Sequence, residues 1–322
     1  MPNAVLVGLG KIGAKLKNLK NLSRTHLDAL IRNGISPIAL IDKTNKDFNQ
    51  ISKKFKLKKN IFFKLSDIKK KLNSDILIFA TPPQNKFKLI TDVCKKIDSR
   101  FLIIEKPLSD KLNDAKLIHQ FLKKNNKKAF VSYQRNWDKK TSLFLNKIEK
   151  KKIDFINVTY SKGFLNNASH YLYEIMKICG KIDFNSLKVI NYVARPYKNF
   201  SFFIKIGGIP VYFICNKFDK NKIEYQELSV HCDKSVYELK SGGALKKITL
   251  MKKNEIYPGY NFLNTKSVNY HTGPLNPLTN LYKDVKKITL KKKKYNNQNL
   301  IISLEIIKLN NILENRAKNK KI

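Results

Sequence analysis

The stretch AVLVGLGKIG, residues 4–13, joins a short apolar run to three closely spaced glycines. An apolar run that ends at a turn signal is typical of a buried strand in a parallel sheet. The pattern Gly-x-Gly-x-x-Gly permits a tight turn and a close approach of the backbone to a pyrophosphate. Because a helical segment follows, the stretch predicts dinucleotide binding. The residues assigned to this loop are Gly8, Gly10, Lys11, Ile12 and Gly13, of which Lys11 either contacts a phosphate or is solvated.

An acidic residue ends the second apolar run, IALID, residues 38–42. Asp42 lies 42 − 13 = 29 positions after Gly13, whereas a spacing of about 20 is common. An extended first helix through residues 23–34 would account for the excess. A carboxylate here hydrogen-bonds the adenosine ribose and repels a ribose phosphate, which favours NAD over NADP. Lys43 and Lys46 weaken this preference, and Asp42 as a plain turn residue is the alternative.

Hydrophobic patterning divides the chain into two parts. Six apolar runs alternate with helical, Lys-rich segments up to about residue 134, which predicts a parallel, doubly wound α/β sheet. After Trp137 the runs become short and alternating, which indicates a mostly antiparallel sheet. At 322 residues, two domains are expected. We predict a Rossmann domain over residues 1–128 and an α/β domain over residues 129–322, with helices at 167–179 and 298–318 and a long loop at 258–280.

The net charge of +41 raises nucleic acid or an anionic membrane as a partner. Only six of the 65 basic residues are Arg, which leaves 65 − 6 = 59 Lys. Nucleic-acid recognition favours Arg, and the Lys runs have no interleaved aromatic residues. We therefore interpret them as solvated surface, so that nucleic acid is an unlikely partner and anionic substrates are attracted.

Cysteine usage and hydropathy give further expectations. The cysteines Cys94, Cys179, Cys215 and Cys232 form no CxxC pair and have no histidine at metal-ligand spacing, so we expect reduced thiols and no metal site. No apolar run approaches the roughly 18 residues of a membrane span, and no basic leader is evident. A cytoplasmic protein without membrane contact is expected.

Two further strands end in unusual residues. Ala80 is followed by Thr81, Pro82 and Pro83, and the stretch FLIIEKPLSD, residues 101–110, ends an apolar run with Glu105, Lys106 and a proline. Ligands of parallel sheets bind beyond the carboxyl ends of the strands. These side chains are therefore expected at the mouth of the binding site, although an ion pair that merely closes a strand is the alternative for the charged pair.

Four motifs together resemble one family. GLGKIG at 8–13, ATPP at 80–83, IIEKPLSD at 103–110 and a glycine seven positions before a histidine at 163–170 are similar, in order and spacing, to the glucose-fructose oxidoreductase and inositol dehydrogenase family (Gfo/Idh/MocA). The resemblance is strongest over residues 1–180. It implies a Rossmann domain, a second α/β domain with a large open sheet, and hydride transfer between a nicotinamide and a secondary alcohol of a sugar or polyol.

The resemblance also implies roles for individual residues. Lys106 would bind the reacting hydroxyl and stabilise a developing alkoxide, with Glu105 holding it or contacting the cofactor. His170 would take the hydroxyl proton near neutral pH. Thr81 and Pro82 would shape the loop against the nicotinamide half. Arg135 would contact cofactor or substrate, or alternatively form a surface ion pair.

The chain departs from the family at three positions near these motifs. Asn166 replaces a common Asp four residues before His170, Tyr173 replaces a frequent Asp, and Lys86 replaces a common His. An amide cannot act as a base, so Asn166 can only orient the substrate or His170. In the family, branches that act on nucleotide-linked sugars tolerate such a change.

The leading hypothesis is an NAD-dependent oxidoreductase of a sugar or sugar derivative, with a nucleotide-linked sugar of surface polysaccharide synthesis as one candidate. A polyol or inositol-type dehydrogenase is the second hypothesis. A non-catalytic nucleotide- or nucleic-acid-binding protein is the third. A homodimer or homotetramer is expected because one face of an open sheet needs a cover.

Overall fold

The computed structural model describes residues 1–16, 22–149, 152–194, 196–216, 224–270 and 276–319. The chain forms two compact units. The first consists of Met1–Asp138 and Asn276–Ile307, and the second of Lys139–Leu275 and Lys308–Ile322. In the described ranges, no helix is long and apolar enough to cross a membrane.

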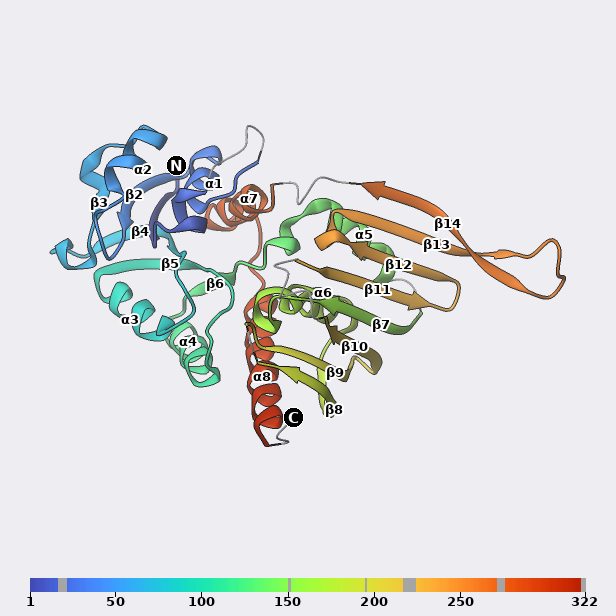
Figure 1. Ribbon diagram of the computed structural model, residues 1–322. Coiled ribbons are helices and arrows are strands. Elements are labelled where there is room, and N and C mark those ends of the chain that lie inside the picture. Colours follow the sequence, from blue (N-terminus) through green and yellow to red (C-terminus); the bar gives the residue numbers. More distant parts are fainter. Residues whose placement is uncertain (17–21, 150–151, 195, 217–223, 271–275, 320–322) are drawn as a thin grey trace. The chain divides into compact units, whose positions relative to one another are not determined.

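The first unit contains a six-stranded parallel sheet (Figure 1). Its strands are β1 (Asn3–Val7), β2 (Ser36–Ile41), β3 (Phe62–Phe63), β4 (Leu72–Phe79), β5 (Ile97–Ile104) and β6 (Lys128–Val131). The order β3-β2-β1-β4-β5-β6 is that of a doubly wound dinucleotide-binding sheet and confirms the predicted fold class. The strand order reverses between β1 and β4, so a ligand crevice is expected beyond the carboxyl ends of these strands.

Helices and short helical turns connect the parallel strands. The helices are α1 (His26–Arg32), α2 (Phe48–Phe55), α3 (Lys86–Lys96) and α4 (Leu112–Lys124), and the shorter turns are η1 (Lys11–Lys15), η2 (Lys59–Ile61), η3 (Leu65–Asp67) and η4 (Gln134–Trp137). The prediction of one extended first helix was wrong. Helix α1 begins only at His26, because Thr25 is its N-cap and accepts a hydrogen bond from the backbone N–H of Asp28 at 3.2 Å.

Helix α7 (Pro277–Thr289) belongs to the first unit, although it comes late in the sequence. Its apolar face joins the core that covers β1, β4 and β5, through Leu278, Leu281, Tyr282, Val285 and Ile288. Asn280 Nδ2 donates to the carbonyl of Trp137 at 2.9 Å. This division differs from the boundary expected at residue 128, because α7 packs on α1 and η4 and the chain between them forms the second unit.

The second unit contains an eight-stranded sheet, in which only β7 and β10 pair in parallel. Its strands are β7 (Ile153–Tyr160), β8 (Ile182–Val193), β9 (Asn199–Ile206), β10 (Ile209–Cys215), β11 (Gln226–Cys232), β12 (Ser235–Lys240), β13 (Leu245–Lys253) and β14 (Asn261–Tyr270). The order is β14-β13-β12-β11-β7-β10-β9-β8. This mostly antiparallel sheet confirms the second part of the predicted fold class.

The remaining elements are α5 (Lys139–Glu149), η5 (Phe164–Ala168), α6 (Ser169–Cys179), η7 (Ser241–Gly243) and α8 (Gln298–Asn319). The two predicted helices at 167–179 and 298–318 are therefore present. The long loop predicted at 258–280 was wrong, because β14 and the start of α7 lie within it. In Figure 1, β13 and β14 form a long hairpin at one edge of the second sheet. Pairing with β13 supplies the backbone hydrogen bonds that make 261–270 a strand.

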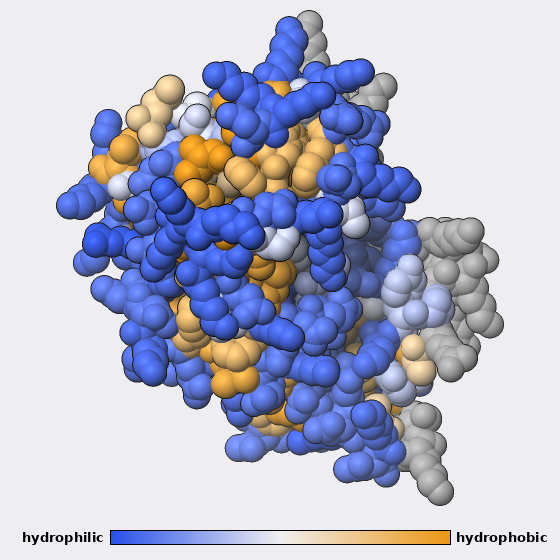
Figure 2. Space-filling model, turned by 90° about the vertical axis from the view of Figure 1, so that its left-hand side faces the viewer, coloured by the Kyte–Doolittle hydropathy of each residue, from blue (hydrophilic) through white to orange (hydrophobic). Residues whose placement is uncertain are grey.

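Hydrophilic side chains predominate on the face drawn in Figure 2, and hydrophobic side chains gather in several patches between them. A chain with 59 Lys among 65 basic residues is expected to look this way, because a long Lys side chain keeps its ammonium group in water. The described part of the chain shows no cluster of three His, Cys, Asp or Glu side chains suited to a metal ion. All four cysteines are free thiols, and burial raises the pKa of Cys94 to about 11 and that of Cys179 to about 12.

Candidate cofactor-binding and catalytic residues

Five strands of the first sheet end in one row. Val7 pairs with Ile41 and with Phe79, Phe79 pairs with Ile104, and Ile104 pairs with Val131. Each of the residues that follow therefore starts from the same edge of the sheet. The structure thus brings to one edge the glycine loop after β1, Asp42 after β2, Thr81 after β4, the Glu105-Lys106 pair after β5 and Arg135 after β6.

Two glycines of the loop are required by its backbone. Gly8 has φ +94°, and its N–H donates to the carbonyl of Ile41 at 2.8 Å. A Cβ on Gly13 would lie 2.1 Å from the carbonyl oxygen of Gly8. A side chain at either position would force the turn open, so the sequence pattern here is a physical requirement of the fold.

Gly10 differs, because nothing lies within 4 Å of the position that its Cβ would take. Its φ of −66° and ψ of −160° are also open to other residues. The space beside Gly10 therefore fits the close approach of a pyrophosphate to the backbone. Lys11 is exposed and Ile12 half-buried in the turn that follows.

Thr81 lies against this loop, with its Cγ2 2.8 Å from the position of a Cβ on Gly8. Its buried Oγ1 has no hydrogen-bond partner among the described residues. A buried hydroxyl without a partner is costly, and a polar ligand at this edge would satisfy it. The open space at Gly10 and the hydroxyl of Thr81 together fit a dinucleotide cofactor. Pro82 is exposed in the same loop.

Asp42 is tied directly to the glycine loop. Its Oδ2 accepts a hydrogen bond from the N–H of Leu9 at 2.6 Å, and its Oδ1 accepts one from the N–H of Lys43 at 2.7 Å. Lys43 and Lys46 are exposed. Asp42 is therefore more than a turn residue, because it fixes the loop from the neighbouring strand.

Sequence reasoning missed a lysine that closes the turn after the glycine loop. Lys54 Nζ donates to the carbonyls of Ala14 and Leu16, both at 2.9 Å. These groups lie at the end of η1, where backbone carbonyls lack helical partners. A lysine within the run at 53–59 thus has a structural contact, although most of that run is exposed.

Glu105 turns out to contact a core histidine. Its Oε1 lies 2.8 Å from Nε2 of His26, and Nδ1 of His26 lies 2.7 Å from the hydroxyl of Tyr282. His26 and Tyr282 are fully buried. Burial alone raises the pKa of Glu105, but the hydrogen bond and charge of His26, together with a hydrogen bond from Ser132 and the charge of Lys106, outweigh it, and the pKa is lowered. Burial, and then the charge of Glu105, raise the pKa of Tyr282 well above its usual value, which keeps its hydroxyl protonated.

Lys106 is half-buried and follows Glu105 at the end of β5. An unexpected residue lies beside this turn. Lys86, the first residue of α3, has no exposed surface. Its Nζ donates to the carbonyl of Glu105 at 2.6 Å and to the carbonyl of Pro107 at 2.8 Å. The substitution of Lys for a common His was the only sequence signal of this contact.

The second unit holds the other two predicted catalytic residues. Asn166 is exposed in η5, and His170 is half-buried near the start of α6, four positions later. Gly163 before them has φ +93°, and its N–H donates to Oδ1 of Asn199 at 2.8 Å. Asn167 Nδ2 donates to the carbonyl of Ser161 at 2.8 Å, so Asn167 stabilises this turn.

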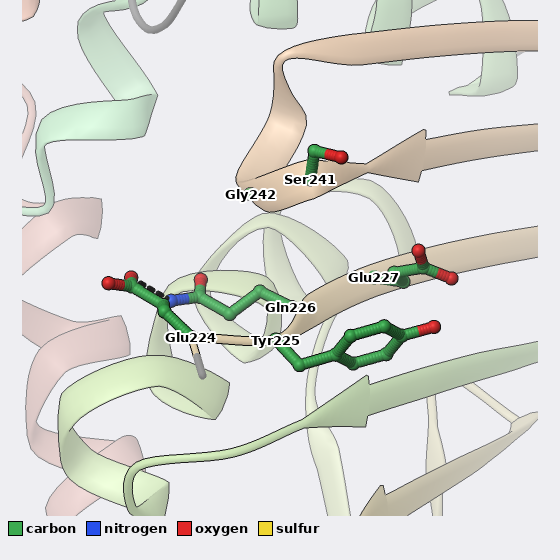
Figure 3. Close-up of a pocket in the computed structure, with 6 residues that line it drawn as sticks. All are labelled: Glu224, Tyr225, Gln226, Glu227, Ser241 and Gly242. Carbon is green, nitrogen blue, oxygen red and sulfur yellow. Dashed lines mark hydrogen bonds between the residues drawn. The ribbon is translucent and has the colours of Figure 1, made fainter. Parts of the chain in front are cut away.

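A pocket of about 280 Å³ lies beside this segment in the second unit (Figure 3). Its lining residues are Glu224, Tyr225, Gln226, Glu227, Ser241 and Gly242. Gln226 Nε2 donates to Glu224 Oε1 at 2.9 Å, drawn as a dashed line in Figure 3. Lys162 Nζ lies 3.7 Å from Oε2 of Glu224.

Two hydrogen bonds join Tyr225 of the pocket to Ser161, which precedes the His170 segment in the sequence. The N–H of Tyr225 donates to Ser161 Oγ at 2.8 Å, and the N–H of Ser161 donates to the carbonyl of Tyr225 at 2.9 Å. Burial, and then the hydrogen bond and charge of Glu227, raise the pKa of Tyr225 to about 12. The lining therefore offers carboxylate, amide and hydroxyl groups, which can bind hydroxyl groups of a ligand.

Comparison with known proteins agrees with this organisation. Residues 3–133 match the Gfo/Idh/MocA family, described as an oxidoreductase family with an NAD-binding Rossmann fold. In sequence, no curated protein matches the chain.

Solved structures share the fold over nearly the whole length. A super-repressor mutant of Gal80p from Saccharomyces cerevisiae is 13% identical, with a TM-score of 0.74, over 98% of this chain and 95% of that one. UDP-N-acetylglucosamine 3-dehydrogenase from Acidithiobacillus ferrooxidans is 8% identical, with a TM-score of 0.68, over 97% and 96%. An oxidoreductase from Agrobacterium radiobacter in complex with NAD⁺, L-tartaric acid and magnesium is 12% identical, with a TM-score of 0.67, over 95% and 94%. At these identities the likeness shows the fold.

Proposed function

Because residues 3–133 match the Gfo/Idh/MocA oxidoreductase family with its NAD-binding Rossmann fold, we propose that the protein transfers hydride to or from a secondary alcohol of a sugar or sugar derivative. One observation carries the proposal. Lys106 follows β5 at the edge where the glycine loop, Asp42 and Thr81 also lie. A cation at this edge is suited to a reaction in which an alkoxide develops beside a bound dinucleotide.

The cofactor would lie along the glycine loop, with its pyrophosphate beside Gly10 and its adenosine ribose near Asp42. Asp42 favours NAD, because a carboxylate repels the additional phosphate of NADP. When bound, the nicotinamide supplies the hydride acceptor or donor. Thr81 Oγ1 and Arg135 are proposed to contact the cofactor from the ends of β4 and β6.

The remaining steps belong to side chains of the chain. Lys106 binds the reacting hydroxyl oxygen and stabilises its negative charge. His170 takes the hydroxyl proton in oxidation and returns it in reduction. Asn166 orients the substrate or His170, because an amide donates and accepts hydrogen bonds but does not act as a base.

A nucleotide-linked sugar is the favoured substrate class, within synthesis of a surface polysaccharide. One solved structure with this fold is a UDP-N-acetylglucosamine 3-dehydrogenase. A diphosphate linkage is anionic, and the net charge of +41 would attract it. The polar pocket beside the His170 segment offers partners for sugar hydroxyls. A free polyol or inositol has the same hydroxyl chemistry without the charge, so substrate panels with and without a nucleotide group separate the two.

The first experiment is a titration of the purified protein with NADH and, separately, NADPH, followed by energy transfer from protein aromatic residues at physiological salt. Tighter binding of NADH is expected. Turnover is then measured on UDP-sugars and polyols for Lys106→Ala and His170→Ala, with Lys116→Ala, an exposed residue of α4, as the control. Loss of most turnover in the first two variants, with NADH binding retained, is the expected result. Unchanged turnover would contradict the assignment.

A second candidate function is a non-catalytic, nucleotide-binding regulator. It is favoured by the fold shared with a super-repressor mutant of Gal80p and by the positive charge of the chain. It predicts nucleic-acid binding that survives physiological salt and does not depend on Lys106. Filter binding to random-sequence DNA at 150 mM salt discriminates this candidate, and the scarcity of Arg argues against it.

A further inference from the structure

Lys86 is the first residue of α3 and is completely buried. Its ammonium group donates hydrogen bonds to the carbonyls of Glu105 and Pro107, at 2.6 and 2.8 Å. These two carbonyls belong to the residues directly before and after Lys106. One side chain therefore holds the backbone on both sides of the proposed catalytic lysine.

A buried ammonium group is costly, and a protein tolerates it only where it is paired or hydrogen-bonded. Burial lowers the pKa of Lys86 to about 8, an effect that the charges of Glu105 and Asp110 oppose and that the charge of Lys106 strengthens. An apolar residue at this position would avoid the desolvation cost. However, an apolar residue could not donate hydrogen bonds to the two carbonyls, so these bonds are what the lysine adds.

We propose that Lys86 is a positioning residue for Lys106, which holds the two flanking carbonyls and so fixes the direction in which the Lys106 side chain leaves the end of β5. The meaning of this contact for catalysis rests on the function proposed above. The contact itself does not depend on that function.

The chain offers a matched control at the other end of the same helix. Lys96 Nζ donates to the carbonyls of Leu65 and Ile68, at 3.1 and 3.0 Å. Lys96→Met therefore removes a similar pair of hydrogen bonds without touching residues 105–107. Lys86→Met removes the pair around Lys106, and Lys86→Gln removes the charge but keeps two N–H donors.

One measurement tests the proposal without cofactor or substrate, on variants whose fold is verified by circular dichroism. It is amide hydrogen exchange of the peptide that covers residues 104–112, which contains both carbonyls that Lys86 holds.

Lys86→Met is expected to speed the exchange of this peptide about tenfold, because both carbonyls lose their hydrogen-bond donor. Lys86→Gln keeps two N–H donors and is expected to restore part of the protection. Lys96→Met is expected to leave the exchange at the wild-type rate. If Lys86→Met does not fold, the exchange in Lys86→Gln decides, and a folded Lys86 variant with unchanged exchange would overturn the proposal. This readout does not need oxidoreductase activity, so failure of the proposed function and failure of the positioning role are distinguishable.

Discussion

Oε1 of Glu105 lies 2.8 Å from Nε2 of His26, and the two side chains are 10% and 0% exposed. The carboxylate next to Lys106 therefore contacts a histidine of α1, and Tyr282 of α7 holds the other nitrogen of the same ring. Three segments that are far apart in the sequence are thus joined at the end of β5. This network gives Glu105 a structural partner other than Lys106.

Replacing Glu105 tests this network through the dependence of stability on acid pH. The pKa of Glu105 is lowered in the folded protein, so its stabilisation is present above its ordinary pKa of 4.5 and is lost as the pH falls through the lower folded value. Glu105→Ala is expected to reduce the free energy of unfolding by about 3 kcal/mol at pH 7, because it leaves a buried partner unpaired. Urea denaturation at pH 7 and at pH 3.5 measures the difference, which should shrink at the lower pH. Tyr282→Phe, which keeps the carboxylate, should cost about 1 kcal/mol at both pH values.

Lys86 should change the free energy of unfolding at alkaline pH. Its pKa is lowered from 10.5 to about 8 in the folded protein, so the unfolded chain binds more protons between these values. The free energy of unfolding should therefore rise between pH 8 and pH 10.5, by at most about 3 kcal/mol from this group. Denaturation at both pH values, compared with Lys86→Met, isolates the contribution. An equal change in wild type and variant would show that Lys86 does not titrate in this range.

Two glycines of the same motif should behave differently. Gly13→Ala places a Cβ 2.1 Å from the carbonyl oxygen of Gly8, so we expect a loss of at least about 2 kcal/mol of stability. Gly10→Ala meets nothing within 4 Å and should leave stability within about 1 kcal/mol of wild type. Its methyl group would occupy the space beside the proposed pyrophosphate, and NADH binding should weaken by about tenfold or more. Thermal unfolding and NADH titration of both variants measure this contrast, and an intact NADH affinity in Gly10→Ala would place the cofactor elsewhere.

Asp42 should determine cofactor choice by its charge. Asp42→Asn keeps an oxygen that can accept from the N–H of Leu9, so the loop should remain folded. Loss of the negative charge removes the repulsion of a ribose phosphate, and Lys43 and Lys46 then favour NADPH. The ratio of the two dissociation constants should shift toward NADPH by about tenfold or more. A ratio that stays constant would indicate that Asp42 serves only the loop.

Several expectations from the sequence stay predictions. The assembly as a dimer or tetramer requires sedimentation of the purified chain, and the catalytic roles of Lys106 and His170 require the variants described above. The orienting role of Asn166 also stays a prediction.

The sequence by itself determined that the chain forms two sheets, and it also determined which residues follow the carboxyl ends of the strands in the first sheet. Buried parallel strands need continuous apolar runs, and a glycine turn and an acidic residue at their ends are local features that a short stretch encodes. Only the tertiary structure decided that α7 returns to the first unit, that His26 joins Glu105 to Tyr282, and that Lys86 holds the backbone around Lys106. These contacts link residues between 19 and 256 positions apart, and periodicity and turn chemistry report only on near neighbours in the chain.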